Sequence, residues 1–142
     1  MNITLKVEGL DKLQDKLKAL DDAVAADMLE KAVLAGAKIV RDDASRRAPK
    51  RTGKLSESIE VEVKAKSRES VSVAVGPNKE AFYGKFIELG HALVRGSKKA
   101  EKKVLGHVPA RPFLRPAIDE NEANVKRVVA EELKKALGRV VR

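Results

Sequence analysis

Residues 22–47 contain no proline, and their apolar side chains recur at three- and four-residue spacing along two adjoining stripes. The stripes consist of Val24, Met28, Ala32, Ala35 and Ile39, and of Leu29, Val33, Gly36, Val40 and Ala44. Asp21 or Asp22 can cap the first turn, and Pro49 marks the end, because the residue before a proline is pushed out of the helical conformation. The pattern predicts a long, deeply buried helix that runs to about Arg47.

Segments in which apolar and polar residues alternate lie on both sides of this helix. Residues 3–7 are typical of a half-buried strand, and residues 55–63 and 71–75 repeat the alternation around a polar turn at residues 64–70. The apolar members of the later pair are Leu55, Ile59, Val61, Val63, Val71, Val73 and Val75. We expect an antiparallel hairpin whose apolar face packs on the long helix. Leucines at positions 10, 13, 17 and 20 predict an additional amphipathic helix.

The C-terminal part predicts a second long helix, entered through the proline-rich residues 109–117 and ended by Gly138. Its apolar stripe is Leu114, Ile118, Val125, Val129, Leu133 and Ala136. Residues 82–89 hold an apolar run that fits a strand or a helix. The predicted fold class is α+β, with a small antiparallel sheet packed against a long central helix and a C-terminal helix. The length of 142 residues favours one domain.

The positive charge is concentrated in two segments. The chain has 30 Lys and Arg against 21 Asp and Glu, a net charge of +9, and the excess falls in residues 38–54 and 91–115. Residues 91–108 show scarcely any apolar periodicity and exceed most loops in length, so we expect a mobile basic arm there. The candidate contacts to a neighbouring subunit or to DNA are Arg46, Arg47, Lys50, Arg51, Lys54, Arg95, Lys98, Lys99, Lys102, Lys103, Arg111 and Arg115.

The sequence shows no recognised arrangement of catalytic residues. There is no cysteine, which excludes disulfides, thiolate nucleophiles and cysteine-ligated metals. His91 and His107 lack the spacing of a metal site, and no serine lies in a nucleophile elbow. We therefore expect no catalytic residues, no cofactor, no metal and no small-molecule substrate. No apolar run approaches the roughly 18 residues that span a bilayer, so we expect no membrane partner.

Three motifs, in order along the chain, resemble one protein family. The first is Ala-Pro…Thr-Gly-x-Leu-x-x-Ser-Ile at residues 48–59, the second is Val-Gly…Tyr…Glu-x-Gly within residues 75–90, and the third is Ala-Arg-Pro-Phe-Leu-Arg-Pro-Ala at residues 110–117. Together they resemble the neck or minor tail component family of lambdoid long-tailed bacteriophages and prophages, which acts in head–tail joining and tail completion. The arm at residues 91–108 is longer and more basic than the link associated with that family.

The resemblance implies a structural virion protein rather than an enzyme. It implies a small subunit that is made in the bacterial host cytoplasm and assembles into a homo-oligomeric ring at the phage head–tail junction. Its partners would be neighbouring connector and tail proteins, with double-stranded DNA passing through the channel. The alternative hypothesis is a free double-stranded nucleic-acid-binding module that uses the basic loops, although the aromatic content of 3% offers little stacking surface.

Overall fold

The computed structural model describes residues 2–3, 15–16, 18, 20–96 and 102–140. Its elements are β1 (Asn2–Ile3), α2 (Asp22–Arg47), α3 (Lys54–Ser58), β2 (Ile59–Lys66), β3 (Val71–Pro77), the 3-10 helix η1 (Lys79–Ala81), α4 (Gly84–Leu89), β4 (His91–Arg95), β5 (Lys103–Val108) and α5 (Leu114–Val140). Helices and two antiparallel sheets occur in one chain, which confirms the α+β class.

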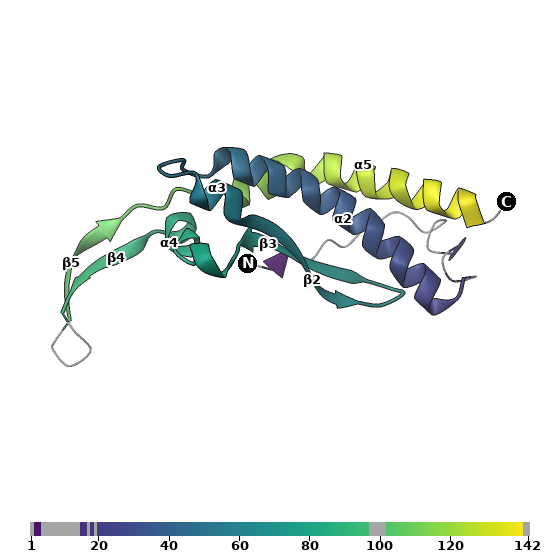
Figure 1. Ribbon diagram of the computed structural model, residues 1–142, viewed down its shortest axis with the longest axis horizontal. Helices are drawn as coiled ribbons and strands as arrows, with labels where there is room; N and C mark the ends of the chain where they lie inside the picture. The colour runs from purple at the N-terminus through teal and green to yellow at the C-terminus, as the bar shows by residue number, and fades with distance from the viewer. Residues whose placement is uncertain (1, 4–14, 17, 19, 97–101, 141–142) are drawn as a thin grey trace.

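The long helix α2 forms the middle layer of the molecule. Helix α5 runs beside it on one side, and the sheet β1-β3-β2 covers it on the other (Figure 1). The predicted bounds of α2 and the entry of α5 are confirmed. Asp21 occupies the N-cap position, but the predicted side-chain cap is wrong, because its carboxylate makes no capping hydrogen bond. Val24, at the exposed first turn, also lies outside the core and is 40% exposed.

The three-stranded sheet has the predicted alternation. Strand β3 lies in the middle and pairs antiparallel with β1 and β2, with Val61 opposite Val75 and Val63 opposite Val73. Val71, Val73 and Val75 are buried against α2, whereas Glu60 and Glu62 lie on the outer face. Of the predicted strand at residues 3–7, the described part is Ile3 in β1. Residues 4–7 lie outside the described residues, as do Leu10, Leu13 and Leu17 of the predicted leucine helix.

The first half of the predicted strand 55–63 is wrong, because residues 54–58 form the short helix α3. Leu55 and Ile59 are both buried, and their four-residue spacing fits one face of a helix as well as one face of a strand. Contacts between segments favour the helix. Ser45 Oγ donates to the carbonyl of Ser56 over 2.6 Å, and Ser56 Oγ donates to the carbonyl of Ser45 over 2.7 Å. These two bonds hold the segments α2 and α3 side by side.

Helices α2 and α5 approach closely at Gly36. A Cβ at this position would lie 2.9 Å from a methyl carbon of Val125 and 2.9 Å from one of Val129. Both valines are buried on the predicted stripe of α5, together with Leu133. The predicted end at Gly138 is wrong, because α5 continues to Val140, and the tertiary contacts of the preceding turns carry it past this glycine.

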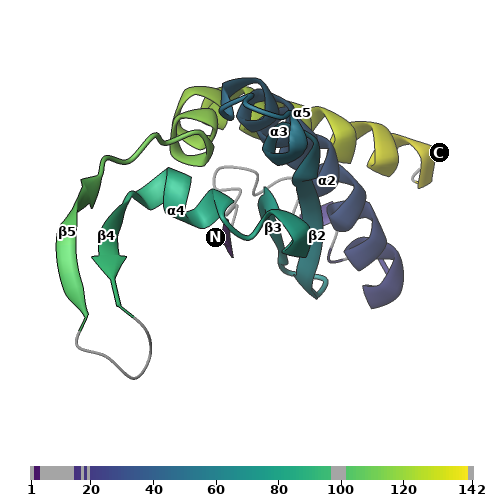
Figure 2. The same ribbon diagram turned by 60° about the vertical axis from the view of Figure 1, so that its left-hand side comes forward.

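Residues 91–108 are not the irregular loop that the sequence suggested. Strands β4 and β5 pair antiparallel from His91 opposite Val108 to Arg95 opposite Lys103, with a bulge near Leu93. Backbone hydrogen bonds between two strands do not require a long alternation of apolar and polar side chains. The sequence pattern therefore did not predict β4 and β5. The β4–β5 hairpin projects away from α2 and its sheet in both views (Figures 1 and 2). Its mobility stays a prediction, as does the single domain.

We predict that Gly36→Ala destabilises the protein although alanine is the better helix former. The new methyl must displace two β-branched side chains that are almost fully buried, which costs about 1–3 kcal/mol and outweighs a helix gain of about 1 kcal/mol. Gly138→Ala in α5 is the matched control, because nothing lies within 4 Å of the position. Thermal unfolding should show a lower Tm for Gly36→Ala and an unchanged or higher Tm for Gly138→Ala. Equal shifts would contradict the close packing.

Candidate assembly surface

Two of the family-like motifs meet at the start of α5. Glu88, from the Glu-x-Gly motif in α4, is 4% exposed, and its carboxylate accepts backbone N–H bonds from Phe113 at 2.7 Å, Leu114 at 3.0 Å and Arg115 at 3.1 Å. These amides belong to the Ala-Arg-Pro-Phe-Leu-Arg-Pro-Ala motif and open the helix, where backbone donors lack partners within the helix. A negative charge is also favoured there by the helix dipole. Glu88 therefore joins α4 to α5.

The same contact region holds the base of the β4–β5 hairpin. The amide of Arg111 donates to the carbonyl of Ile87 over 2.8 Å, so the chain is tied at both ends of the hairpin. Gly90 ends α4 with φ of +72°, and a Cβ there would lie 2.7 Å from the Val108 carbonyl oxygen. A glycine is needed on both counts. The hairpin thus leaves the body in a direction set by these backbone contacts at its base.

A second buried carboxylate binds two of the predicted contact residues, Arg46 and Arg47. Asp43 in α2 accepts hydrogen bonds from Arg46 at 3.3 Å, Arg47 at 3.0 Å and the Asn121 amide at 2.7 Å, and Arg47 also pairs with Glu120. Burial alone would raise the pKa of Asp43, but these three donors together hold that pKa below its usual value. Arg47 serves mainly to join α2 to α5, and Arg46 retains an exposed side chain.

The remaining described candidates lie at the surface around one end of the molecule. Lys50, Arg51, Lys54, Arg95, Lys102, Lys103 and Arg111 are exposed and form no ion pair within the described part of the chain. Arg115 makes a long, exposed pair with Asp119 at 3.9 Å. Lys98 and Lys99 lie outside the described residues. The C-terminal end of α2, α3, the start of α5 and the hairpin all lie toward the same end in Figure 1. We call this region the basic end.

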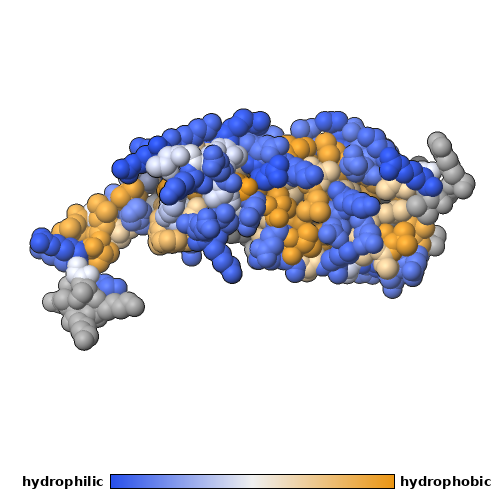
Figure 3. Space-filling model, viewed as in Figure 1, coloured by the Kyte–Doolittle hydropathy of each residue, from blue (hydrophilic) through white to orange (hydrophobic). Residues whose placement is uncertain are grey.

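The hairpin carries a surface that charge counting missed. Leu93 and Val94 are 46% and 48% exposed although, as neighbours in a strand, they point to opposite faces. On β5, Val104 lies opposite Val94, Leu105 lies at the bulge, and both are also exposed. Figure 3 shows hydrophobic residues along the hairpin with hydrophilic ones at its outer edge. In the sequence, the dipeptides Leu93-Val94 and Val104-Leu105 were the only sign of this surface. Two residues are too few to show the alternation of a strand.

Exposed apolar side chains also occur in the segment just before the hairpin, which includes α4. Phe82, Phe86 and Leu89 are exposed, and the ring of Phe86 contacts that of His91 edge-on with centroids 5.7 Å apart. Eight of the nine large hydrophobic residues that are exposed in the described chain fall within residues 82–108. Such a concentration of exposed apolar side chains is typical of a contact with another macromolecule.

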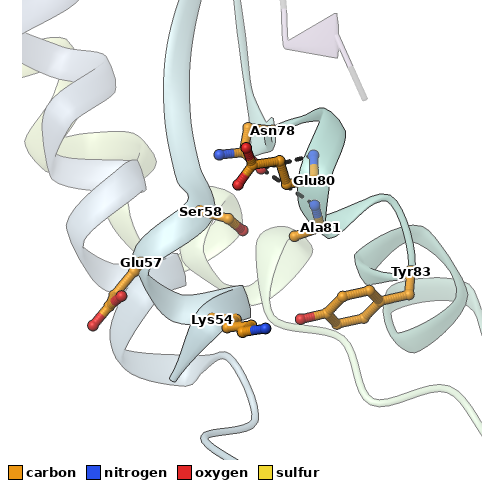
Figure 4. Close-up of a pocket in the computed structure, with 7 residues that line it drawn as sticks. All are labelled: Lys54, Glu57, Ser58, Asn78, Glu80, Ala81 and Tyr83. Atoms are coloured by element: carbon orange, nitrogen blue, oxygen red, sulfur yellow. Dashed lines mark hydrogen bonds between the residues drawn. The ribbon is translucent and has the colours of Figure 1, made fainter. Parts of the chain in front are cut away.

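A shallow polar pocket of about 330 Å³ lies beside this surface, between α3 and η1. Lys54 and Tyr83 point toward one another across it, and Glu57 and Glu80 stand at its margin (Figure 4). The described residues hold no group of three side chains placed to bind a metal ion. Among the same residues, every helix is too short or too polar to cross a membrane. The pocket offers polar contacts without a recognisable catalytic arrangement.

Comparison with known proteins assigns the chain to a family. A family model described as "Bacteriophage HK97-gp10, putative tail-component" matches residues 11–90. The match includes the first two motifs and ends at Gly90, where the hairpin begins. No curated protein and no solved structure matches the chain. The family resemblance inferred from the motifs is confirmed.

We predict that Glu88→Gln lowers the free energy of unfolding by about 1–3 kcal/mol, because an amide has one acceptor oxygen for three buried N–H donors. Glu60→Gln removes the same charge from an exposed strand position and should change stability by less than about 0.5 kcal/mol. Urea denaturation of both variants measures the difference. A loss no larger than that of the control would show that Glu88 does not hold α5.

The Asp43 contacts predict a pH-dependent stability difference. Because its pKa is lowered in the folded protein, Asp43 contributes stability above the unfolded pKa of about 3.9, and this contribution is lost as pH falls through the folded value. Asp43→Asn should be less stable than the wild type at pH 7, and the difference should shrink as pH falls below the unfolded pKa of about 3.9. Urea denaturation between pH 7 and pH 2.5 tests this. A constant difference across that range would contradict the assignment.

Proposed function

Because the chain belongs to the HK97-gp10-like family of bacteriophage tail components, we propose that it is a ring-forming subunit at the phage head–tail junction. In this proposal it acts as a neck or tail-completion protein, contacts neighbouring connector and tail proteins, and surrounds double-stranded DNA. It has a structural role in the virion and catalyses no reaction.

The observation that carries this proposal is the projecting β4–β5 hairpin. It exposes apolar side chains on both faces and makes sparse contact with the other described elements. A two-stranded hairpin is at best marginally stable in water without a covering surface. A subunit that extends such an element from a firmly held base is suited to repeated contact with neighbours, which is what a ring requires.

The basic end supports a position around DNA. Lys50 and Arg51 lie in the loop after α2, and Arg111 lies just before α5, so three exposed cations flank the joined ends of the two long helices. Positive charge on a channel wall attracts a polyanion through long-range electrostatics without reading sequence. The alternative, a free duplex-binding module, uses the same charges but gives no reason for the exposed apolar hairpin.

Self-association separates these two functions. Sedimentation velocity of the purified chain at rising concentration, with negative-stain microscopy, should reveal closed oligomers of one size. A chain that stays monomeric throughout and binds duplex DNA with a steep salt dependence would refute the ring and support the free module.

We predict that changing Lys50, Arg51 and Arg111 together to glutamine weakens duplex binding by the assembled protein and leaves its assembly and Tm unchanged. Each lost phosphate contact should reduce the slope of log K against log salt by about 0.9. Lys31, Lys38 and Lys134, which are exposed and unpaired within the described chain, provide a control triple with the same charge loss. Fluorescence anisotropy with labelled duplex measures both. Equal weakening by the two triples would show that net charge alone, rather than this end, attracts DNA.

A further inference from the structure

The described residues of the β4–β5 hairpin are all exposed or half-buried. Neither strand packs extensively on α2, α5 or the three-stranded sheet, and the hairpin extends away from them (Figure 2). Its position is therefore fixed at its base, where α4 precedes it and the exposed residues 109–112 follow it. We call α4 and the hairpin together, residues 84–110, the arm, and we call the layers formed by α2, α5 and the three-stranded sheet the body.

The first half of α4 touches the body through a glycine. Gly84 is buried, and a Cβ at this position would lie 2.6 Å from Cγ of Pro77 and 2.7 Å from Cδ1 of Leu55. Phe86 and Leu89, also in α4, are exposed. A glycine has no side chain to bury, so the hydrophobic effect contributes little to this contact.

The second half of α4 is held mainly by polar bonds. The Glu88 carboxylate accepts the three N–H bonds that open α5, and the Arg111 amide donates to the carbonyl of Ile87. Ile87 adds one half-buried side chain at the edge of the core. Loss of these bonds would leave the start of α5 in place, because Phe113 and Leu114 are buried in the core. Release of the arm is thus compatible with a folded body.

We propose that the arm opens from the body as one unit and that Glu88 is its latch. In the docked form, which predominates, Glu88 binds the amides of α5 and Gly84 contacts Leu55 and Pro77. In the released form these contacts break together, while α2, α5 and the three-stranded sheet keep their packing. Because release exposes little apolar surface, it requires less free energy than global unfolding, and it gives the hairpin other directions from which a neighbouring molecule selects one. The inference concerns the single subunit and does not depend on whether the protein forms a ring.

Native-state hydrogen exchange of the purified chain in low concentrations of denaturant tests the release. The amides of Phe86, Ile87 and Arg111 form backbone bonds at the base of the arm, and a helix of six residues does not persist without its docking contacts. These three amides should therefore share one opening free energy. It should be lower than that of the central amides of α2 and should depend less steeply on denaturant, because less surface is exposed. Exchange of the three amides at the global value, together with α2, would overturn the proposal.

Two glycine variants provide a matched comparison. Gly84→Ala places a methyl group against Leu55 and Pro77, and it should raise the exchange rates of the arm amides roughly tenfold. Gly36→Ala makes the same chemical change between α2 and α5, whose packing persists in the released form. It should therefore accelerate exchange of the α2 amides and leave the arm amides unchanged. Equal acceleration of both sets by Gly36→Ala would show that arm and body open together, which contradicts the proposal.

Glu88→Gln tests the latch itself. It should also accelerate exchange of the arm amides roughly tenfold, because one acceptor oxygen remains for three N–H donors. Glu60→Gln removes the same charge from an exposed strand position and should leave these rates unchanged. If Glu88→Gln accelerates the arm amides no more than Glu60→Gln does, Glu88 is not the latch.

Discussion

Burial of α2 on two sides is the constraint on which the rest of the structure depends. A helix that carries one apolar stripe needs a single partner, whereas α2 must be covered by α5 and by the sheet. The close approach at Gly36 brings α5 onto one side, and Val71, Val73 and Val75 cover the other. Because the sides of α2 are covered in these three layers, the loops, the exposed charges and the projecting hairpin lie at the ends of the helices.

The family-like motifs maintain this arrangement. Ser45 and Ser56 join α2 to α3, and Glu88 joins α4 to the start of α5. The second and third motifs thus stabilise each other, with the hairpin inserted between them. An insertion at such a point can vary in length without disturbing the three layers, since both of its ends are held by backbone contacts. Function is left to the exposed surfaces.

Positive charge and exposed apolar area are combined at one end of the molecule. Asp43 and Glu120 pair with Arg47 between α2 and α5, so the basic character of the surface comes from the exposed Arg46, the loop after α2, the start of α5 and the hairpin. Apolar area favours protein contacts and unpaired cations favour acidic partners, whether carboxylates or phosphates. The ring subunit proposed above would meet both requirements.

The sequence by itself determined the elements whose periodicity is long and unambiguous. The apolar stripes of α2 and α5 predicted two long helices. The alternation of apolar and polar residues around Val61 and Val63, and again around Val73 and Val75, predicted an antiparallel hairpin. Together these elements predicted the α+β class. The three motifs identified the family for a related reason, because their order and spacing carry more information than any one residue.

The tertiary structure alone decided the features that depend on contacts between distant segments. Leu55 and Ile59 fit a strand or a helix, and the hydrogen bonds between Ser45 and Ser56 favoured the helix. The capping of α5 by Glu88 spans 25 residues, so local pattern could not reveal it. The β4–β5 hairpin is formed by backbone pairing, which the spacing of apolar side chains does not predict. Only the folded structure shows that its apolar side chains are exposed. Local periodicity reports which side of an element is apolar, and the folded chain decides what covers it.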